Sequence, residues 1–143
     1  MLLPDVNIFV HAFRTDTERH SEYRNWIEAQ LSGAEPVGVG EAVLASVVRI
    51  VTNHRIFREP SPLPLALEFC AAVRGAPAAV VVRPSDRHWE LFDRLCRDGG
   101  ATGNLVPDAD LAALAIEHGA TLISTDRGML RWPGLAVRHP LQG

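Results

Sequence analysis

The sequence predicts a three-layer α/β/α sandwich built around a mainly parallel central sheet. Short apolar stretches of strand length alternate with longer segments of helical periodicity along the chain. One apolar run, residues 80–82, suits a strand that is buried on both faces, as strands of parallel sheets are. The length of 143 residues, with 47% hydrophobic and 22% charged side chains, is typical of a single globular domain over residues 1–143.

The N-terminal half begins with an expected strand at residues 1–4, which runs directly into Asp5. A helix is expected over residues 16–32, because apolar side chains recur on its faces and Gly33 follows its end. Residues 36–39 form the second expected strand. Residues 41–53 have apolar side chains at helical spacing and predict a helix, although their many β-branched residues partly favour a strand.

The C-terminal half continues the alternation. The proline-rich loop 60–64 starts a helix that extends to about residue 72, and the strand at 80–82 follows. Ser85 and Asp86 are suitable caps for a helix to about Arg97. A strongly periodic segment predicts the next helix at residues 108–118, and the last two strands are expected at residues 121–124 and 135–137.

Several protein classes are excluded by composition. No apolar run approaches the roughly 18 residues that a membrane-spanning helix needs. The N-terminal sequence MLLPDVNIFV has no basic segment before its apolar residues, so no signal peptide is expected. Cys70 and Cys96 are expected to be reduced, and the protein is expected to be cytoplasmic.

The charge balance argues against a protein that binds nucleic acid through bulk positive charge, because the formal net charge is −3. The basic residues are nevertheless all arginine, 14 in number. Guanidinium groups bind phosphate in a bidentate manner, so arginines can still line a local groove. A GC-rich genome is the alternative explanation for this bias.

Four acidic residues occupy positions where the chain leaves a strand or enters a helix. Asp5 follows the first strand, Glu41 follows the second, and Asp126 follows the strand at 121–124. Asp108 opens the helix that leads into that strand. Ligands of open parallel sheets bind outside the carboxyl ends of the strands, so these four side chains are expected to converge there.

Converging carboxylates repel one another by roughly 4 kcal/mol for a pair about 4 Å apart. Such a cluster takes up protons or binds a cation, and oxygen ligands alone favour Mg²⁺ or Mn²⁺. Hydrolysis of a phosphodiester is the reaction class that this chemistry implies. Taken singly, each acid can also be an ordinary turn or helix-start residue. Asp110 points about 200° away from Asp108 on a helix and is expected to face solvent.

Three stretches of the sequence carry a resemblance to a known family. They are LLPDVNIFVHAF, GEAVLASVVRIVTNHRIF and GNLVPDADLAALAIEHGATLISTDRGMLRWPGL. Their order resembles that of the PIN-domain ribonucleases, and most closely the VapC toxins of bacterial type II (VapBC) toxin–antitoxin systems. The resemblance implies a PIN fold, Mg²⁺ or Mn²⁺ as cofactor, endonucleolytic cleavage of RNA, homodimerisation, and inhibition by a cognate VapB-type antitoxin.

The resemblance also implies roles for individual residues. Asp5, Glu41, Asp108 and Asp126 fall on the acidic quartet of the family, and Asn7 and Ser124 fall on polar positions that support it. We expect Asp5 and Asp126 to ligate the metal directly and Asp108 to do so directly or through water. Glu41 is expected to ligate the metal or to orient the attacking water.

The sequence departs from the family pattern after Asp126. Many relatives have an acid and an aromatic residue two and three positions further on, where this chain has Gly128 and Met129. One well-held metal ion is therefore expected, and a second ion only together with substrate.

Four arginines near the acids in the sequence are expected to contact RNA phosphates: Arg14, Arg49, Arg127 and Arg131. The apolar helices at 16–32 and 41–53 are the expected surfaces for the dimer and the antitoxin. Two alternatives stay open at this point. One is a housekeeping PIN nuclease that processes RNA without an antitoxin, and the other is a non-catalytic binding module whose acids are structural.

Overall fold

The structure is a computed structural model that describes residues 1–142. Its elements alternate between strands and helices along most of the chain. In chain order they are β1 (Leu2–Pro4), α1 (Val6–Phe13), α2 (His20–Leu31), β2 (Val37–Gly40), α3 (Glu41–Val51), α4 (Leu63–Arg74), β3 (Ala79–Val82), α5 (His88–Gly99), α6 (Leu105–Glu117), β4 (Thr121–Ile123), the 3₁₀ helix η1 (Arg127–Arg131) and β5 (Val137–Arg138).

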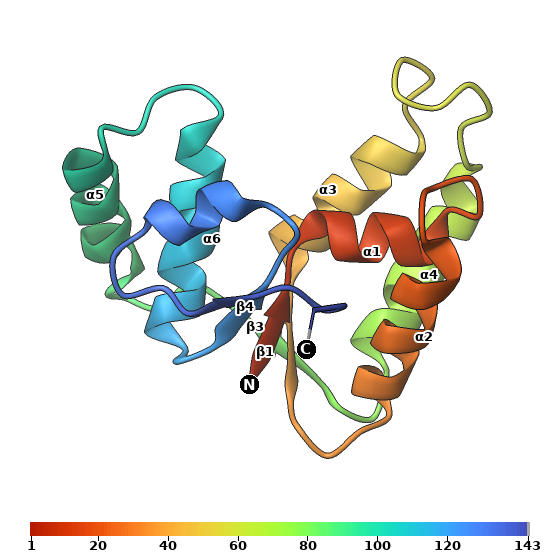
Figure 1. Ribbon diagram of the computed structural model, residues 1–143, viewed down its shortest axis with the longest axis horizontal. Coiled ribbons are helices and arrows are strands. Elements are labelled where there is room, and N and C mark those ends of the chain that lie inside the picture. The colour runs from red at the N-terminus through yellow and green to blue at the C-terminus, as the bar shows by residue number, and fades with distance from the viewer. Residues whose placement is uncertain (143) are drawn as a thin grey trace.

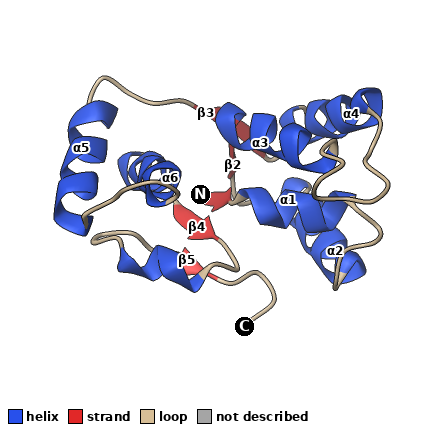
Figure 2. Ribbon diagram, turned by 90° about the horizontal axis from the view of Figure 1, so that it is seen from above, coloured by secondary structure: helices blue, strands red, loops and turns tan. Residues whose placement is uncertain are grey.

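The five strands form one parallel sheet in the order β3-β2-β1-β4-β5. Helices α1 to α4 cover one side of the sheet, and α5 and α6 cover the other (Figure 1). The view from above shows the strands between these two groups of helices (Figure 2). The predicted three-layer α/β/α fold is therefore confirmed.

Each side of the sheet has its own hydrophobic core. The core under α1 to α4 includes Ile8 and Phe9, and the core under α5 and α6 includes the alanines of α6 and Trp132. Neighbouring side chains on the central strand β1 serve different cores, since Leu2 packs in the first and Leu3 in the second. This alternation is what a strand covered on both faces requires.

Three local expectations are corrected. The segment after Asp5 was not expected to be helical, yet Val6–Phe13 forms α1 and buries its apolar face. The helix expected from residue 16 begins at His20. Strand β3 lies at the edge of the sheet and is only partly buried, with Val80 45% exposed, because an edge strand has a neighbour on one side only.

The parallel arrangement brings the carboxyl ends of β1, β2 and β4 to one edge of the sheet. Asp5 directly follows β1, Glu41 directly follows β2, and Ser124 directly follows β4. Within residues 1–142, no helix is long and apolar enough to cross a membrane.

Candidate active site

Asp5 is held in place by the backbone of α1 and by a distant serine. It is the N-cap of α1, and its Oδ1 accepts a hydrogen bond of 2.7 Å from the Val6 N–H. Its Oδ2 accepts a hydrogen bond of 2.8 Å from Ser124 Oγ. Burial raises the pKa of Asp5; the two hydrogen bonds lower it and the charge of Asp126 raises it, with a net result above the ordinary 3.8. The carboxylate is thus fixed in orientation and sensitive to neighbouring charge.

Asp126 is tied to the same serine through its backbone. Its N–H donates to Ser124 Oγ at 3.0 Å, and its Oδ1 accepts from the Gly128 N–H at 2.8 Å, which caps η1. A Cβ added at position 128 would lie 2.9 Å from Asp126 Oδ1. The glycine that departs from the family pattern is therefore compatible with this cap, and a larger residue would require the Asp126 carboxylate to shift.

Asp108 lies in the first turn of α6 and lines a cavity together with Asp5. Burial raises the pKa of Asp108, the charges of Asp126 and Asp5 raise it further, and Arg131 lowers it. The three carboxylates therefore share one electrostatic environment, although they come from three separate segments of the chain. The expected convergence of all four acids on one ion stays a prediction, because Glu41 is not among these interacting charges.

Glu41 begins α3 and has different partners. Its Oε2 lies 3.2 Å from Arg74 Nη2, and its Oε1 lies 3.3 Å from Arg83 Nη2. Neither arginine was among the expected site residues, because Arg74 ends α4 and Arg83 follows β3, both far from Glu41 in the sequence. Glu41 still lines the same cavity of about 250 Å³ as Asp5 and Asp108.

The donor set fits a hard divalent cation, since it offers carboxylate oxygens with no thiol beside them. Within residues 1–142, however, no three His, Cys, Asp or Glu side chains already stand close enough to enclose an ion. Asp126 and Glu41 are exposed, so rotation of these two side chains is compatible with the packing. Asp5 is fixed by its hydrogen bonds and is the natural anchor for an ion.

His88 is a buried residue beside this cavity that the sequence reading missed. Its Nδ1 lies 2.7 Å from Glu117 Oε1, and its Nε2 lies 2.7 Å from Asp110 Oδ1. Burial lowers the pKa of His88, but hydrogen bonds and charges from the two carboxylates outweigh burial and raise it above 6.5. Asp110 is exposed as expected, yet it also pairs with this histidine, which corrects the expectation that it only faces solvent.

Glu117 completes this network at the end of α6. Its Oε2 accepts hydrogen bonds from the Ser85 hydroxyl at 2.5 Å and from the Ser85 N–H at 3.1 Å. Burial raises the pKa of Glu117, but the hydrogen bonds from Ser85 and His88 outweigh it and lower the pKa overall. Sequence spacing gives no signal for these contacts, since Glu117 is 29 positions from His88 and 32 from Ser85.

Arg14 is not available to substrate, which corrects the expectation that it contacts RNA. Its side chain is buried and donates to Asp16 Oδ1 at 2.9 Å, to the Glu59 carbonyl at 2.7 Å and to Ser61 Oγ at 3.0 Å. Its guanidinium also lies 4.0 Å from the centre of the Phe57 ring. Arg14 therefore joins the segment after α1 to the loop before α4.

The other residues that were expected to support the site do not all lie beside the acids. Arg131 is close enough to lower the pKa of Asp108, and Arg127 is exposed in the same 3₁₀ helix. Arg49 is exposed at the far end of α3, about 12 Å along the helix from Glu41. Asn7 is exposed on α1, and within residues 1–142 its side chain makes no hydrogen bond to Asp5.

Comparison with known proteins gives the family context for this site. The profile of the PIN domain family matches residues 2–135. Ribonuclease VapC43 of Mycobacterium tuberculosis is 45% identical over 143 residues, covering 100% of this chain and 97% of that protein. Ribonuclease VapC25 of the same species is 40% identical over 139 residues, covering 97% and 96% of the two chains.

Solved structures share the fold at lower identity. VapBC2 of Rickettsia felis, bound to a DNA fragment from its promoter, superposes with a TM-score of 0.71 at 18% identity, over 96% of this chain and 97% of that one. VapC20 of Mycobacterium tuberculosis, a toxin that cleaves the sarcin–ricin loop, superposes with a TM-score of 0.67 at 16% identity, over 95% and 99% of the two chains. At this identity the likeness shows the fold alone.

Proposed function

Because the chain belongs to the PIN domain family, and within it to the VapC-type toxins, we propose that it is a divalent-metal-dependent endoribonuclease and the toxin of a toxin–antitoxin pair. The observation that carries this proposal is geometric: Asp5 and Asp108 line one cavity at the carboxyl edge of the sheet, and Ser124 joins Asp5 to the backbone of Asp126. We also propose that residues 1–143 form a single PIN domain.

Asp5, Asp108 and Asp126 would hold Mg²⁺ or Mn²⁺ in this proposal. Such an ion would lower the pKa of a water molecule and offset negative charge on the phosphate. Ser124 is a positioning residue: its hydroxyl donates to Asp5 and its oxygen accepts from the Asp126 backbone, so it fixes the distance between the two segments. Arg131, which lies near Asp108, is suited to meet a phosphate oxygen of the substrate.

Glu41 has a separate part in the proposed reaction. Its carboxylate is exposed at the wall of the cavity and is not among the charges that raise the pKa of Asp5 or Asp108. It is therefore suited to orient the attacking water rather than to anchor the ion. Arg74 and Arg83 form ion pairs with this carboxylate and would position it at the cavity wall.

A partner protein has an apolar surface to bind on this chain. Leu63, Leu65 and Leu67 of α4 and Ile56 in the preceding loop are each about half exposed. The apolar residues Tyr23 and Ile27 of α2 are buried inside the chain. We therefore propose that the dimer or antitoxin contact is centred on α4 and its preceding loop, and not on the helix expected at residues 16–32.

The test is to sequence RNA 5′ ends after induced expression of the native protein and of Asp5→Asn. New 5′ ends at defined positions with the native protein, absent with Asp5→Asn, support the nuclease. Asn is isosteric and keeps an oxygen to accept from Val6, so the fold is expected to survive. Identical 5′ ends in the two strains, with both proteins folded, contradict the assignment.

The toxin role is tested separately from cleavage. A candidate antitoxin, encoded by a small reading frame next to the gene, is co-expressed with the native protein, and RNA cleavage and cell growth are measured. Growth arrest that is relieved by co-expression supports a toxin with an antitoxin. Cleavage that persists unchanged contradicts the toxin role and favours the housekeeping PIN nuclease.

A further inference from the structure

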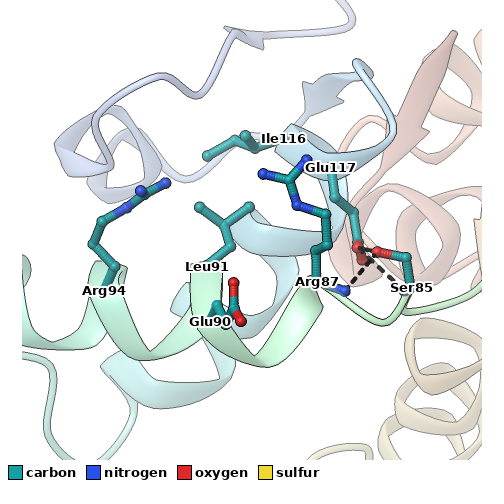
Figure 3. Close-up of a pocket in the computed structure, with 7 residues that line it drawn as sticks. All are labelled: Ser85, Arg87, Glu90, Leu91, Arg94, Ile116 and Glu117. Carbon is teal, nitrogen blue, oxygen red and sulfur yellow. Dashed lines mark hydrogen bonds between the residues drawn. The ribbon is translucent and has the colours of Figure 1, made fainter.

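A second cavity, of about 350 Å³, lies between α5 and the end of α6, outside the acidic site. Figure 3 shows Arg87 and Arg94 reaching from α5 toward Ile116, with Leu91 between them. The floor of the cavity is therefore apolar and its two ends carry guanidinium groups. We refer to this cavity, lined by Ser85, Arg87, Glu90, Leu91, Arg94, Ile116 and Glu117, as the α5 cavity.

The two guanidinium groups of the α5 cavity are available for a ligand. Arg87 and Arg94 are exposed, and within residues 1–142 neither guanidinium forms an ion pair or a side-chain hydrogen bond. Some other arginines of the chain are engaged, such as Arg97 of the same helix, which pairs with Asp93 at 3.0 Å. Seven positions separate Arg87 and Arg94, which corresponds to about 10 Å along the helix.

Two carboxylates, Glu90 and Glu117, also line the α5 cavity, so its lining has as many formal negative charges as positive ones. The Glu117 carboxylate is already hydrogen-bonded to the Ser85 hydroxyl and to His88. Glu90 lies beside the helix and does not reach toward Ile116 with the arginines (Figure 3). The α5 cavity therefore presents two unpaired guanidinium groups beside the apolar side chains of Leu91 and Ile116, and guanidinium groups suit phosphate oxygens.

The α5 cavity is connected to the acidic site by a short stretch of backbone. Arg83 lines the acidic site and Ser85 lines the α5 cavity, and these residues are two positions apart, which is at most about 7 Å. His88 also joins the two places, because it lines the acidic site and bonds to Glu117 of the α5 cavity. An RNA strand that is bound in the acidic site can therefore continue over residues 83–85 into the α5 cavity.

We propose that the α5 cavity is a second binding site for single-stranded RNA, in which Arg87 and Arg94 hold backbone phosphates of the substrate outside the cleavage site. This rests on the proposed function for the identity of the ligand. It predicts that the two arginines contribute to the affinity for RNA and its salt dependence, and not to the chemical step.

The experiment measures binding of a fluorescein-labelled single-stranded RNA of about 12 nucleotides by anisotropy, in EDTA so that no cleavage occurs. The test variant is Arg87→Gln/Arg94→Gln. The matched control is Arg24→Gln/Arg97→Gln, which removes the same charge from two arginines that are already paired with Glu28 and Asp93. Thermal unfolding checks that each variant is folded, and Arg87→Lys/Arg94→Lys is a second variant that keeps the charge and loses the forked geometry.

The proposal predicts about tenfold weaker RNA binding for the glutamine variant, and a slope of log affinity against log salt that is smaller by about 1.4. The lysine variant should fall between the native protein and the glutamine variant, and the control should bind as the native protein does. With Mg²⁺ present, KM should rise while kcat stays the same.

Three results would overturn the proposal. One is RNA binding by the glutamine variant that is as strong as that of the native protein. Another is an equal loss of RNA binding in the glutamine variant and the control, which would indicate an effect of net charge only. The third is unchanged RNA binding with weaker binding of a protein partner, which would assign the α5 cavity to that partner. A native protein that binds RNA through these arginines but never cleaves it would contradict the nuclease and leave this site standing.

Discussion

Ser124 Oγ donates a hydrogen bond of 2.8 Å to Asp5 Oδ2 across 119 positions of sequence. The same oxygen accepts from the Asp126 N–H at 3.0 Å. One buried hydroxyl therefore connects the segment after β1 to the segment after β4, and two of the proposed metal ligands with them. The roles of the surrounding side chains can be tested by single substitutions.

Ser124→Ala is expected to lower the cleavage rate about tenfold, because positioning groups behind metal ligands commonly contribute this much. Loss of the hydrogen bond also raises the pKa of Asp5 further, so the acidic limb of the pH–rate profile should move to higher pH. Thr125→Ala, the next residue, is the control and should leave the profile in place. An unshifted acidic limb in Ser124→Ala would argue against the positioning role.

Arg83→Gln is expected to strengthen Mn²⁺ binding at the acidic site. Arg83 lies 3.3 Å from Glu41, and a neighbouring positive charge opposes the entry of a cation. Because the pair is exposed, the gain should be modest, roughly fivefold in Kd or about 1 kcal/mol. Calorimetry measures this, with Arg138→Gln on β5 as control. Unchanged Mn²⁺ affinity in Arg83→Gln would contradict the expectation that the charge of Arg83 opposes cation binding.

His88 is expected to make the stability of the fold depend on pH. The folded pKa of His88 is raised above 6.5, so its contribution is complete below pH 6.5 and is lost as pH rises through the folded value. Urea unfolding at about pH 6 and about pH 9 should show this decline in the native protein. His88→Gln should cost roughly 2 kcal/mol at the lower pH and show a smaller decline. An equal decline in both proteins would place the pH dependence elsewhere.

Arg14→Ala is expected to destabilise the fold and to leave RNA binding unchanged. It removes hydrogen bonds to Asp16, Glu59 and Ser61 and leaves the Glu59 carbonyl without this donor. The free energy of unfolding should fall by roughly 2 kcal/mol. Arg49→Ala, an exposed arginine of α3, should fall within about 0.5 kcal/mol of the native protein. Weaker RNA binding by a fully folded Arg14→Ala variant would instead support the expectation that Arg14 contacts RNA.

The parts of the fold that sequence predicts well have a strong and regular pattern. Residues 41–53 and 108–118 have helical spacing over three turns, and α3 and α6 form there. The segment after Asp5 was missed because α1 has only eight residues, most of them apolar, so helical spacing is hard to recognise. The edge position of β3 was also missed, since an apolar run does not reveal how many neighbours a strand has.

The candidate site also has features that the sequence predicts and features that it does not. Topology predicts that Asp5 and Asp126, which follow neighbouring parallel strands, lie at one edge of the sheet, and Asp108 begins the helix that leads into β4. The partners of Glu41 and of His88 depend on how α4, α5 and α6 pack, and such contacts leave no local pattern. Arg14 shows the converse error, since closeness in sequence to an acid does not place a side chain in the same cavity.

The central claim is that three separate aspartates form one divalent-cation site, and calorimetric titration with Mn²⁺ tests it most directly. We expect the native protein to bind about one ion with millimolar affinity or better. Asp126→Asn, which keeps an oxygen to cap η1, should lose this heat while its unfolding temperature without metal stays the same or rises. Equal Mn²⁺ binding by Asp126→Asn and the native protein would contradict the claim.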